Sequence, residues 1–291
     1  LHFAGIMGSG MSAIAQYLAW SRQAITGSDR IAFADEMKET KEKLERCGCI
    51  LFPQDGSGIT GATEALVVST AIEDDNPDIA AARKRGIPIL HRSDVLTAIV
   101  SSHRTIAVCG TSGKSTVTAL IFEILRACGK SPSVIAGANL IRLKEEGLLG
   151  NAFKGDSGLL IIEADESDGT LVKYHPEKAV FLNISKDHKS VTETLEVFHR
   201  LASQTPFVIK NADDPELHSI PSAHSFGLPD RADFQPEAVK TVTPSVRFTL
   251  KRTDFELPLP GTHNLSNALA ALCVDEGQGC SLEEMVEPMR E

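Results

Sequence analysis

The chain has 291 residues, of which 42% are hydrophobic and 23% are charged, and its formal net charge is −10. This length exceeds that of most single compact domains, so we expect two domains. The net negative charge argues against a basic surface for nucleic acid. The sequence contains no run of about 18 apolar residues, so we expect no helix that spans a membrane. Local loops and helix ends can still bind anionic ligands in an acidic protein.

The termini and the cysteines indicate where the protein acts. The first residues read as a strand without a basic segment before it, so we find no signal peptide. Because the chain begins with Leu1, we expect its true start to have been trimmed. The six cysteines form no C-x-x-C pair and no zinc-like spacing. We therefore expect reduced thiols and a cytoplasmic location.

Strand-like and helix-like segments alternate over roughly the first 100 residues. Short apolar runs predict strands, and these lie at residues 1–6, 23–29, 49–52, 65–70 and 88–90. Helical patterns lie between them, at residues 11–20, 38–48 and 76–86. The apolar runs are typical of buried strands in a parallel sheet. This alternation predicts an α/β domain with βαβ units.

A glycine-rich turn, GIMGSGMSA, joins the first predicted strand to the first predicted helix. Gly8, Gly10 and Ala13 fit the NAD fingerprint G-x-G-x-x-[GA], and Asp29 follows 19 residues after Gly10. A helix N-terminus and a closely approaching glycine backbone can bind any diphosphate, and an acidic group can bind any ribose. The turn alone leaves three possibilities open: a UDP-sugar, NAD(P), or no ligand.

The pattern restarts near residues 101–103, where we place the boundary between domains 1–101 and 102–291. Further strands are predicted at 104–109, 158–164, 178–184 and 206–210, and further helices at 117–129, 261–277 and 281–291. Weak alternation between residues 230 and 260 predicts a small antiparallel piece. The second domain is therefore also α/β.

A second glycine-rich loop, GTSGKST, follows a predicted strand and opens a predicted helix, as a phosphate loop does. Its backbone N–H groups could hold phosphate oxygens, Lys114 could add positive charge, and Ser115 could ligate Mg²⁺. The general pattern requires glycine at position 108, which is Val108 here, so we expect Gly110 to serve as the first turn glycine. The alternative is a tight turn that contains a lysine by chance.

Acidic residues follow the strand predicted at 158–164. Glu163 lies at its end, and Asp165, Glu166 and Asp168 come just beyond. A carboxylate at the carboxyl end of a parallel strand, beside a phosphate loop, can complete a Mg²⁺ site. A solvated acidic turn is the alternative. His188 follows another strand, and its position alone does not decide its role.

Four motifs in this order and spacing, GTSGKST, EADESDG, NISKDH and GTHNLSNALAA, resemble the central ATPase domain of the Mur ligases. These enzymes build the peptide of bacterial cell-wall precursors, on which cell shape and division depend. The opening HFAGIMGSGMSAIA, with TGSD and VVSTAIEDDNPDI, resembles the N-terminal domain of members that join L-alanine to UDP-N-acetylmuramate. The resemblance implies a Rossmann-like UDP-sugar domain, a P-loop ATPase domain, and ATP with Mg²⁺. The substrate carboxylate would become an acyl phosphate before the amine displaces phosphate.

The resemblance also implies roles for individual residues. ATP would contact Gly110, Thr111, Ser112, Gly113, Lys114, Ser115, Thr116, His263, Asn264 and Asn267. The metal ligands would be Ser115, Glu163 and His188, and Lys114, Glu163 and His188 would serve catalysis. UDP-sugar contacts would come from Gly8, Ser9, Gly10 and Met11, with Ser28, Asp29, Ser69, Thr70 and Arg92 as further candidates. A dehydrogenase has no need of Lys114 with Glu163, so this reading favours a UDP-sugar over NAD(P).

The chain departs from the family pattern in three places. Ser112 stands where His or Asn is common, and Ser190 stands where an Asp often follows the DH pair. The family's third domain, which brings the amino acid, has no counterpart here, so we expect both nucleotides to bind without ligation. The alternatives are a ligase that recycles a tripeptide, another sister enzyme, or a non-catalytic nucleotide-binding module.

Overall fold

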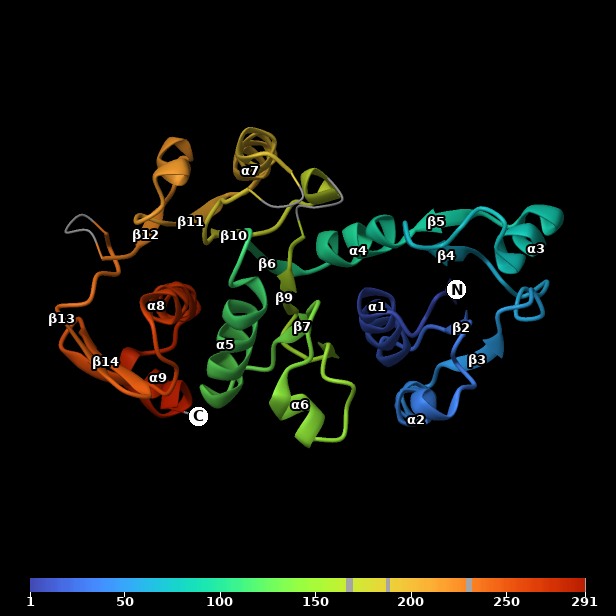
Figure 1. Cartoon of the computed structure of the whole chain (residues 1–291), viewed down its shortest axis with the longest axis horizontal. Helices are drawn as coiled ribbons and strands as arrows, with labels where there is room; N and C mark the ends of the chain where they lie inside the picture. Colours follow the sequence, from blue (N-terminus) through green and yellow to red (C-terminus); the bar gives the residue numbers. More distant parts are fainter. Residues whose placement is uncertain (166–169, 187–188, 229–231, 291) are drawn as a thin grey trace. The chain divides into compact units, whose positions relative to one another are not determined.

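The computed structural model describes residues 1–165, 170–186, 189–228 and 232–290 (Figure 1). The chain forms two compact units, each described here by itself. The first consists of Leu1–Ile99 and Val134–Lys154, and the second of Val100–Ser133 and Gly155–Glu291. Within the described residues, every helix is too short or too polar to cross a bilayer.

A five-stranded parallel sheet organises the first unit. Its order is β3-β2-β1-β4-β5, from the strands β1 (His2–Ala4), β2 (Thr26–Asp29), β3 (Ile50–Pro53), β4 (Leu66–Val68) and β5 (Ile89–His91). The order 3-2-1-4-5 is that of a Rossmann-type sheet, in which strands are added first on one side of β1 and then on the other. The predicted Rossmann-like α/β fold is therefore confirmed.

Three helices connect these strands, α1 (Ser9–Trp20), α2 (Lys38–Arg46) and α3 (Pro77–Arg85), and a fourth, α4 (Arg92–Ser101), follows β5; a short 3-10 turn η1 (Asp35–Met37) precedes α2. The prediction missed α4. The ends of α3 follow from its sequence: Asn76 Oδ1 accepts the Asp78 N–H, Pro77 occupies the first turn, and Gly86 adopts a left-handed conformation with φ +67°.

The two edge strands differ from the prediction of uniformly buried strands. Ile50 in β3 is 59% exposed and Ile89 in β5 is 37% exposed, whereas Phe3 in the central strand β1 is fully buried. Each edge strand has a single neighbour, so side chains there pack on fewer elements. The length of an apolar run does not reveal this difference in position.

The segment 134–154 also belongs to the first unit, and none of its elements was predicted. It holds most of β7 (Ser133–Ile135), α6 (Ile141–Glu145) and β8 (Ala152–Phe153), and β8 pairs antiparallel with β7. Asn151, which is buried, donates its amide to Ser9 O at 2.7 Å and to Ser12 Oγ at 2.8 Å. Gln16 in turn donates to Asn151 Oδ1 at 2.8 Å. These bonds fix the first turns of α1.

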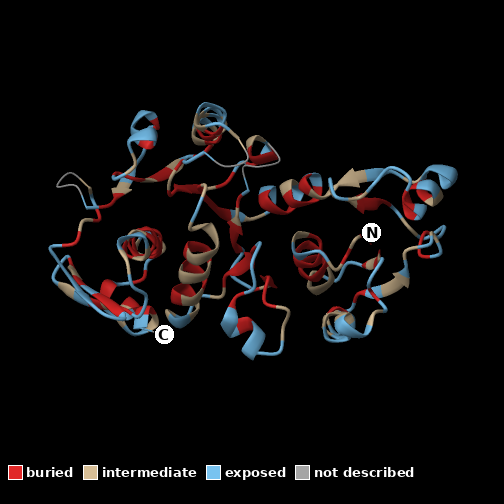
Figure 2. Ribbon diagram, viewed as in Figure 1, coloured by how far each residue is buried: buried red, intermediate tan, exposed pale blue. Residues whose placement is uncertain are grey.

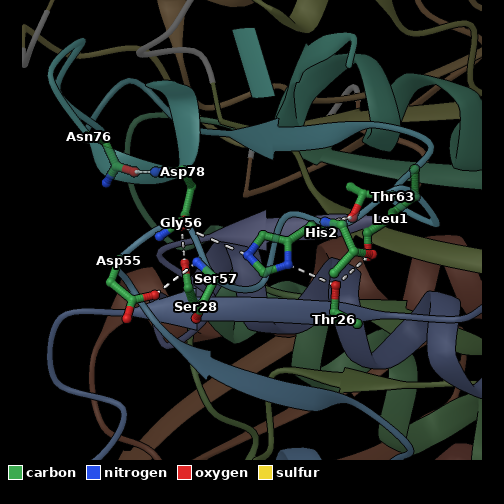
Figure 3. A network of polar contacts seen from close by, with 11 residues as sticks. Leu1, His2, Thr26, Ser28, Asp55, Gly56, Ser57, Thr63, Asn76 and Asp78 are labelled. Carbon is green, nitrogen blue, oxygen red and sulfur yellow. Dashed lines mark hydrogen bonds and ion pairs between the residues drawn. The ribbon is translucent and has the colours of Figure 1, made fainter. Parts of the chain in front are cut away.

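A buried polar network in the first unit joins β1 and β2 to α3 and to the loop after β3 (Figure 3). Asp78 is fully buried, and its carboxylate accepts the Ser28 hydroxyl and the Gly56 N–H. His2 Nε2 lies 3.8 Å from Asp78 Oδ2, and His2 Nδ1 contacts Thr26 Oγ1 at 2.8 Å. One carboxylate thus links β1, β2, α3 and the loop after β3.

The second unit is built on the parallel strands β12-β11-β10-β6-β9, hydrogen-bonded in that order. They are β6 (Arg104–Cys109), β9 (Leu159–Glu163), β10 (Lys178–Phe181), β11 (Phe207–Asn211) and β12 (His224–Phe226). Figure 2 shows the central strands as buried, and Ile106, Val108 and Ile161 have no exposed surface. The strand predictions for β6, β9, β10 and β11 are confirmed to within a few residues.

Helices and a small sheet complete the second unit. The helices are α5 (Lys114–Ala127), α7 (Val191–Gln204), α8 (Thr262–Glu276) and α9 (Leu282–Arg290), with 3-10 turns η2 (Thr170–Lys173) and η3 (Pro215–Ser219). The predicted antiparallel piece is β13 (Ala238–Val242), β14 (Ser245–Leu250) and β15 (Thr253–Leu257). Helix α5 packs against β6, β9, α8 and α9.

Ser190, one of the departures from the family pattern, begins the helix α7. Its hydroxyl accepts the Glu193 N–H, and the Glu193 carboxylate accepts the Ser190 N–H at 2.9 Å, which forms a capping box. The bond from the Ser190 hydroxyl lowers the pKa of Glu193. The residue therefore has a local role in starting α7.

The network around Asp78 generates a stability prediction. Asp78→Ala should lower the free energy of unfolding by about 2–4 kcal/mol, because it leaves the buried Ser28 hydroxyl and the Gly56 N–H without their acceptor and removes the carboxylate beside His2. Chemical denaturation monitored by circular dichroism measures the change. The control is Asp74→Ala, which removes an ion pair from a 94% exposed side chain and should cost less than about 1 kcal/mol. Equal effects of the two substitutions would contradict the assigned role of Asp78.

Candidate functional site

The loop between β6 and α5 has the geometry of a phosphate loop. Gly110 (φ +154°) and Gly113 (φ +86°) make its turns, and α5 begins at Lys114. Val117 donates to Gly113 O at 2.9 Å, so the amides that precede Val117 point along the helix axis toward the loop. Val108 is buried within β6, and Gly110 makes the turn, as predicted. Such a helix start attracts anions.

Two residues of this loop make contacts that matter for phosphate and metal binding. The Lys114 ammonium donates to Gly110 O at 2.6 Å, which holds the charge within the loop. Ser115 Oγ donates to Glu163 Oε1 at 2.9 Å, and Glu163 is the last residue of β9. The carboxyl end of one strand thus meets the helix start that follows the neighbouring strand, as the parallel pairing of β6 with β9 requires.

The donor chemistry of Ser115 and Glu163 fits Mg²⁺, which prefers oxygen ligands and keeps several waters. The third predicted ligand, His188, lies outside the described residues, as do Glu166 and Asp168. Among the residues that the structure describes, His, Cys, Asp and Glu side chains form no group of three that could hold a metal. A hydroxyl and one carboxylate would leave most of the coordination shell to water and phosphate oxygens.

A cavity of about 700 Å³ opens beside the phosphate loop. It brings together residues that are far apart in the sequence. From the predicted set it is lined by Ser112, Gly113, Thr116, His263, Asn264 and Asn267, and from outside that set by Leu182, Asn183, Asn211, Asp213, Leu228, Thr262 and Ser266. The mixture of amide, hydroxyl and imidazole groups beside an anion-binding helix start suits a nucleotide.

Three of the polar lining residues that the prediction missed lie at or just beyond the carboxyl ends of strands in the parallel sheet. Asn183 comes two residues after β10, Asn211 ends β11, and Asp213 follows two residues later. Ligands in open α/β sheets bind at the carboxyl ends of strands. Applying that rule to the predicted strands KAVFLNI and PFVIK would have found them.

The predicted UDP-sugar residues also lie at the carboxyl ends of strands, in the first unit. Gly8 to Met11 follow β1, Ser28 and Asp29 end β2, Ser69 and Thr70 follow β4, and Arg92 follows β5. Since these strands are all parallel, the structure brings these residues to one edge of the sheet. The Arg92 side chain lies against the turn: a methyl group placed on Gly10 would lie 2.7 Å from Arg92 Nη1.

Three of these residues have mainly structural contacts. Ser28 is fully buried and donates to Asp78, while its carbonyl accepts the Gly5 and Ile6 N–H groups at 2.8 and 3.0 Å. Asp29 accepts the Met7 N–H at 3.0 Å and the Ile31 N–H at 3.2 Å. The side chain of Met11 is buried, so only its backbone can face a ligand. Ser28 and Asp29 therefore fix the backbone of the turn by accepting its N–H groups.

Comparison with known proteins agrees with this arrangement. Residues 1–104 match the model of the Mur ligase family, catalytic domain, and residues 108–274 match that of the Mur ligase middle domain. The chain belongs to the Mur ligase family.

Its relatives include enzymes named for one reaction. The UDP-N-acetylmuramate–L-alanine ligase of Gloeobacter violaceus is 34% identical over 308 residues, which cover 100% of this chain and 64% of that protein. The enzyme of the same name from Arthrobacter sp. is 34% identical over 94% of this chain and 60% of its own length. The chain thus spans somewhat less than two thirds of the length of these relatives.

Two solved structures share the fold along nearly the whole chain. The UDP-N-acetylmuramate–alanine ligase of Thermotoga maritima matches with a TM-score of 0.83 and 28% identity, over 99% of this chain and 67% of that one. A UDP-N-acetylmuramate:L-alanyl-γ-D-glutamyl-meso-diaminopimelate ligase from Neisseria meningitides also has a TM-score of 0.83, at 20% identity, over 99% of this chain and 96% of that one. At that identity the second match shows the fold alone.

The geometry of Gly113 generates a prediction for the phosphate loop. Its φ is +86°, and a Cβ there would lie 2.7 Å from Asn267 Oδ1. Gly113→Ala should therefore lower thermal stability by about 1–3 kcal/mol, because it adds backbone strain and displaces a buried amide. Gly129→Ala is the control, since φ is +72° at the other end of the same helix and nothing lies within 4 Å of its Cβ. Differential scanning calorimetry should show the larger loss for Gly113→Ala, and a larger loss at Gly129 would contradict the assigned contact.

Proposed function

We propose that the chain binds ATP with Mg²⁺ in its second unit and UDP-N-acetylmuramate in its first. We further propose that it is the nucleotide-binding part of an ADP-forming ligase that joins L-alanine to the sugar nucleotide in the cytoplasm. The observation that carries the proposal is the contact of Ser115 with Glu163 beside the Lys114 loop. A dinucleotide-dependent oxidoreductase has no use for this arrangement. The 34% identity to alanine-adding relatives favours L-alanine as the amino acid.

The second unit would hold ATP along the cavity described above. The phosphates would lie on the loop Gly110–Thr116, and the base would lie near His263, Asn264 and Asn267, which line the same cavity. On binding, the Lys114 ammonium would exchange the Gly110 carbonyl for phosphate oxygens. That exchange needs only a rotation of the side chain, because the ammonium is already within the loop.

Ser115 and Glu163 would hold Mg²⁺, with His188 as a further ligand. When bound, the metal would offset the negative charge of the phosphates and of the attacking carboxylate. The protein's own contribution is positional. Helix α5 directs backbone amides at the phosphates, and Lys114 adds a full positive charge where negative charge develops in the transition state.

The proposed reaction requires no nucleophile from the protein. The lactyl carboxylate of UDP-N-acetylmuramate attacks the γ-phosphorus of ATP, the bond to ADP breaks, and an acyl phosphate forms. The amine of L-alanine then attacks the acyl carbon and releases inorganic phosphate. The residues named here therefore bind, orient and neutralise charge.

The predicted domain 1–101, of which residues 1–99 lie in the first unit, would hold the UDP diphosphate on the turn at the start of α1. Gly8, Ser9, Gly10 and the Met11 backbone would face the diphosphate, and Arg92 would supply positive charge. Ser69 and Thr70 at the end of β4 remain candidates for the sugar side. Asp29 binds the turn through Met7, so we assign it a positioning role.

Calorimetric titration with Mg·ATP tests the second-unit assignment. Lys114→Ala should weaken ATP binding about 10- to 100-fold, because hydrogen bonds to charged groups are worth roughly 1.5–3 kcal/mol. The loop is not part of the core, so the fold should persist in circular dichroism. The control is Lys130→Ala, which removes an exposed lysine near the opposite end of the same helix. Unchanged ATP affinity in a folded Lys114→Ala protein would contradict the assignment of ATP to this loop.

Titration with UDP-N-acetylmuramate, and separately with NAD, tests the first-unit assignment. Gly10→Ala should weaken UDP-N-acetylmuramate binding about tenfold, because the new methyl group would displace the Arg92 guanidinium from the turn. The same substitution should add little in an Arg92→Ala background, since the two act through one contact. Gly61→Ala, with nothing within 4 Å of its Cβ, is the control. Tight binding of NAD without binding of UDP-N-acetylmuramate would reverse the assignment.

A further inference from the structure

A short segment, residues 182–185, runs along the end of β6 and the phosphate loop and is hydrogen-bonded to them at three of its residues. The Leu182 N–H donates to Cys109 O at 2.9 Å, and the Thr111 N–H donates to Asn183 O at 3.1 Å. Further along, the Ser185 N–H donates to Thr111 Oγ1 at 2.9 Å. The parallel pairing of β10 with β6 thus continues past the ends of both strands into the loop.

The side chain of Asn183 adds a second set of bonds, all to one residue of the loop. Its Oδ1 accepts the Ser112 N–H at 2.9 Å and the Ser112 hydroxyl at 3.2 Å. Its Nδ2 donates to Ser112 O at 2.9 Å. Both ends of the carboxamide therefore hold Ser112, and they fix the peptide groups on either side of its Cα.

This arrangement affects which amides can bind phosphate. In a phosphate loop, successive backbone N–H groups converge on the anion. Here the Ser112 N–H points to Asn183. Ser112 directly precedes Gly113, whose φ of +86° turns the chain into α5. Fixing Ser112 therefore sets the direction from which the start of α5 presents its amides.

We propose that Asn183 is a positioning residue for the phosphates of ATP, acting through Ser112. This inference rests on the proposed binding of ATP to the second unit. Without the carboxamide, the loop would sample other conformations at Ser112, and ATP would have to order it on binding. That ordering reduces affinity for the phosphate part of the ligand. The contacts proposed above for the base, His263, Asn264 and Asn267, do not include the Ser112 peptide.

The test compares two ligands that differ in their phosphates. Calorimetry measures the dissociation constants of Mg·ATP and of adenosine for the unsubstituted chain, for Asn183→Ala and for Asn139→Ala. Asn139 is exposed and lies in the first unit, so it controls for loss of an asparagine side chain. Asn183→Ala should raise the dissociation constant of Mg·ATP about tenfold, as expected for hydrogen bonds of ordinary strength. The constant for adenosine should stay within about twofold, and Asn139→Ala should change neither.

A general structural role predicts a different result, in which Asn183→Ala weakens ATP and adenosine equally. That outcome, or an unchanged constant for Mg·ATP, would overturn the inference while leaving the proposed function intact. If Asn183→Ala does not fold, Asn183→Ser keeps a polar side chain that is too short to bond both the Ser112 N–H and the Ser112 carbonyl, and it should give the same selective loss. Failure of the unsubstituted chain to bind Mg·ATP would instead overturn the proposed function, and this inference with it.

Discussion

Parallel strand pairing is the constraint on which both candidate sites depend. In each unit the strands β3-β2-β1-β4-β5 or β12-β11-β10-β6-β9 run in one direction, so their carboxyl ends meet at one edge and the loops that follow them are neighbours. This pairing brings Glu163 against Ser115 although 48 residues separate them, and it aligns residues 182–185 with the phosphate loop. In the first unit it places Arg92 over Gly10. A sheet of mixed direction would have sent these loops to opposite edges.

The sequence predicted the central strands and both glycine-rich turns because these features are local. A strand pattern followed by glycines and a helical pattern predicts a tight turn between a strand and a helix, as in RTIAVC-GTSGKST. The sequence did not predict α4 or α7, nor the pairs that depend on long-range packing. Asp78 looks like an ordinary helix-start residue, yet it is fully buried and joins four elements. Asn151 holds α1 from a position more than 130 residues away.

The same limit applies to the candidate sites. Residue type and spacing predicted Lys114, Ser115 and Glu163, and the structure places the Lys114 ammonium in the loop and Ser115 against Glu163. They could not separate residues that face a ligand from those that shape a loop. Ser28 and Asp29 have the right chemistry for a sugar nucleotide, but their hydrogen bonds are to Asp78 and to Met7. Asn183 is the converse case: nothing in the motif NISKDH distinguishes it, yet its carboxamide fixes the loop.

The central claim is that two separate turns, one in each unit, hold two different nucleotides. Hydrogen–deuterium exchange of the whole chain with each ligand in turn tests it most directly. Mg·ATP should slow exchange at residues 110–117 and 182–185, and UDP-N-acetylmuramate should slow exchange at residues 5–12 with little change in the second unit. Protection of residues 5–12 by Mg·ATP, or of residues 110–117 by UDP-N-acetylmuramate alone, would contradict the account.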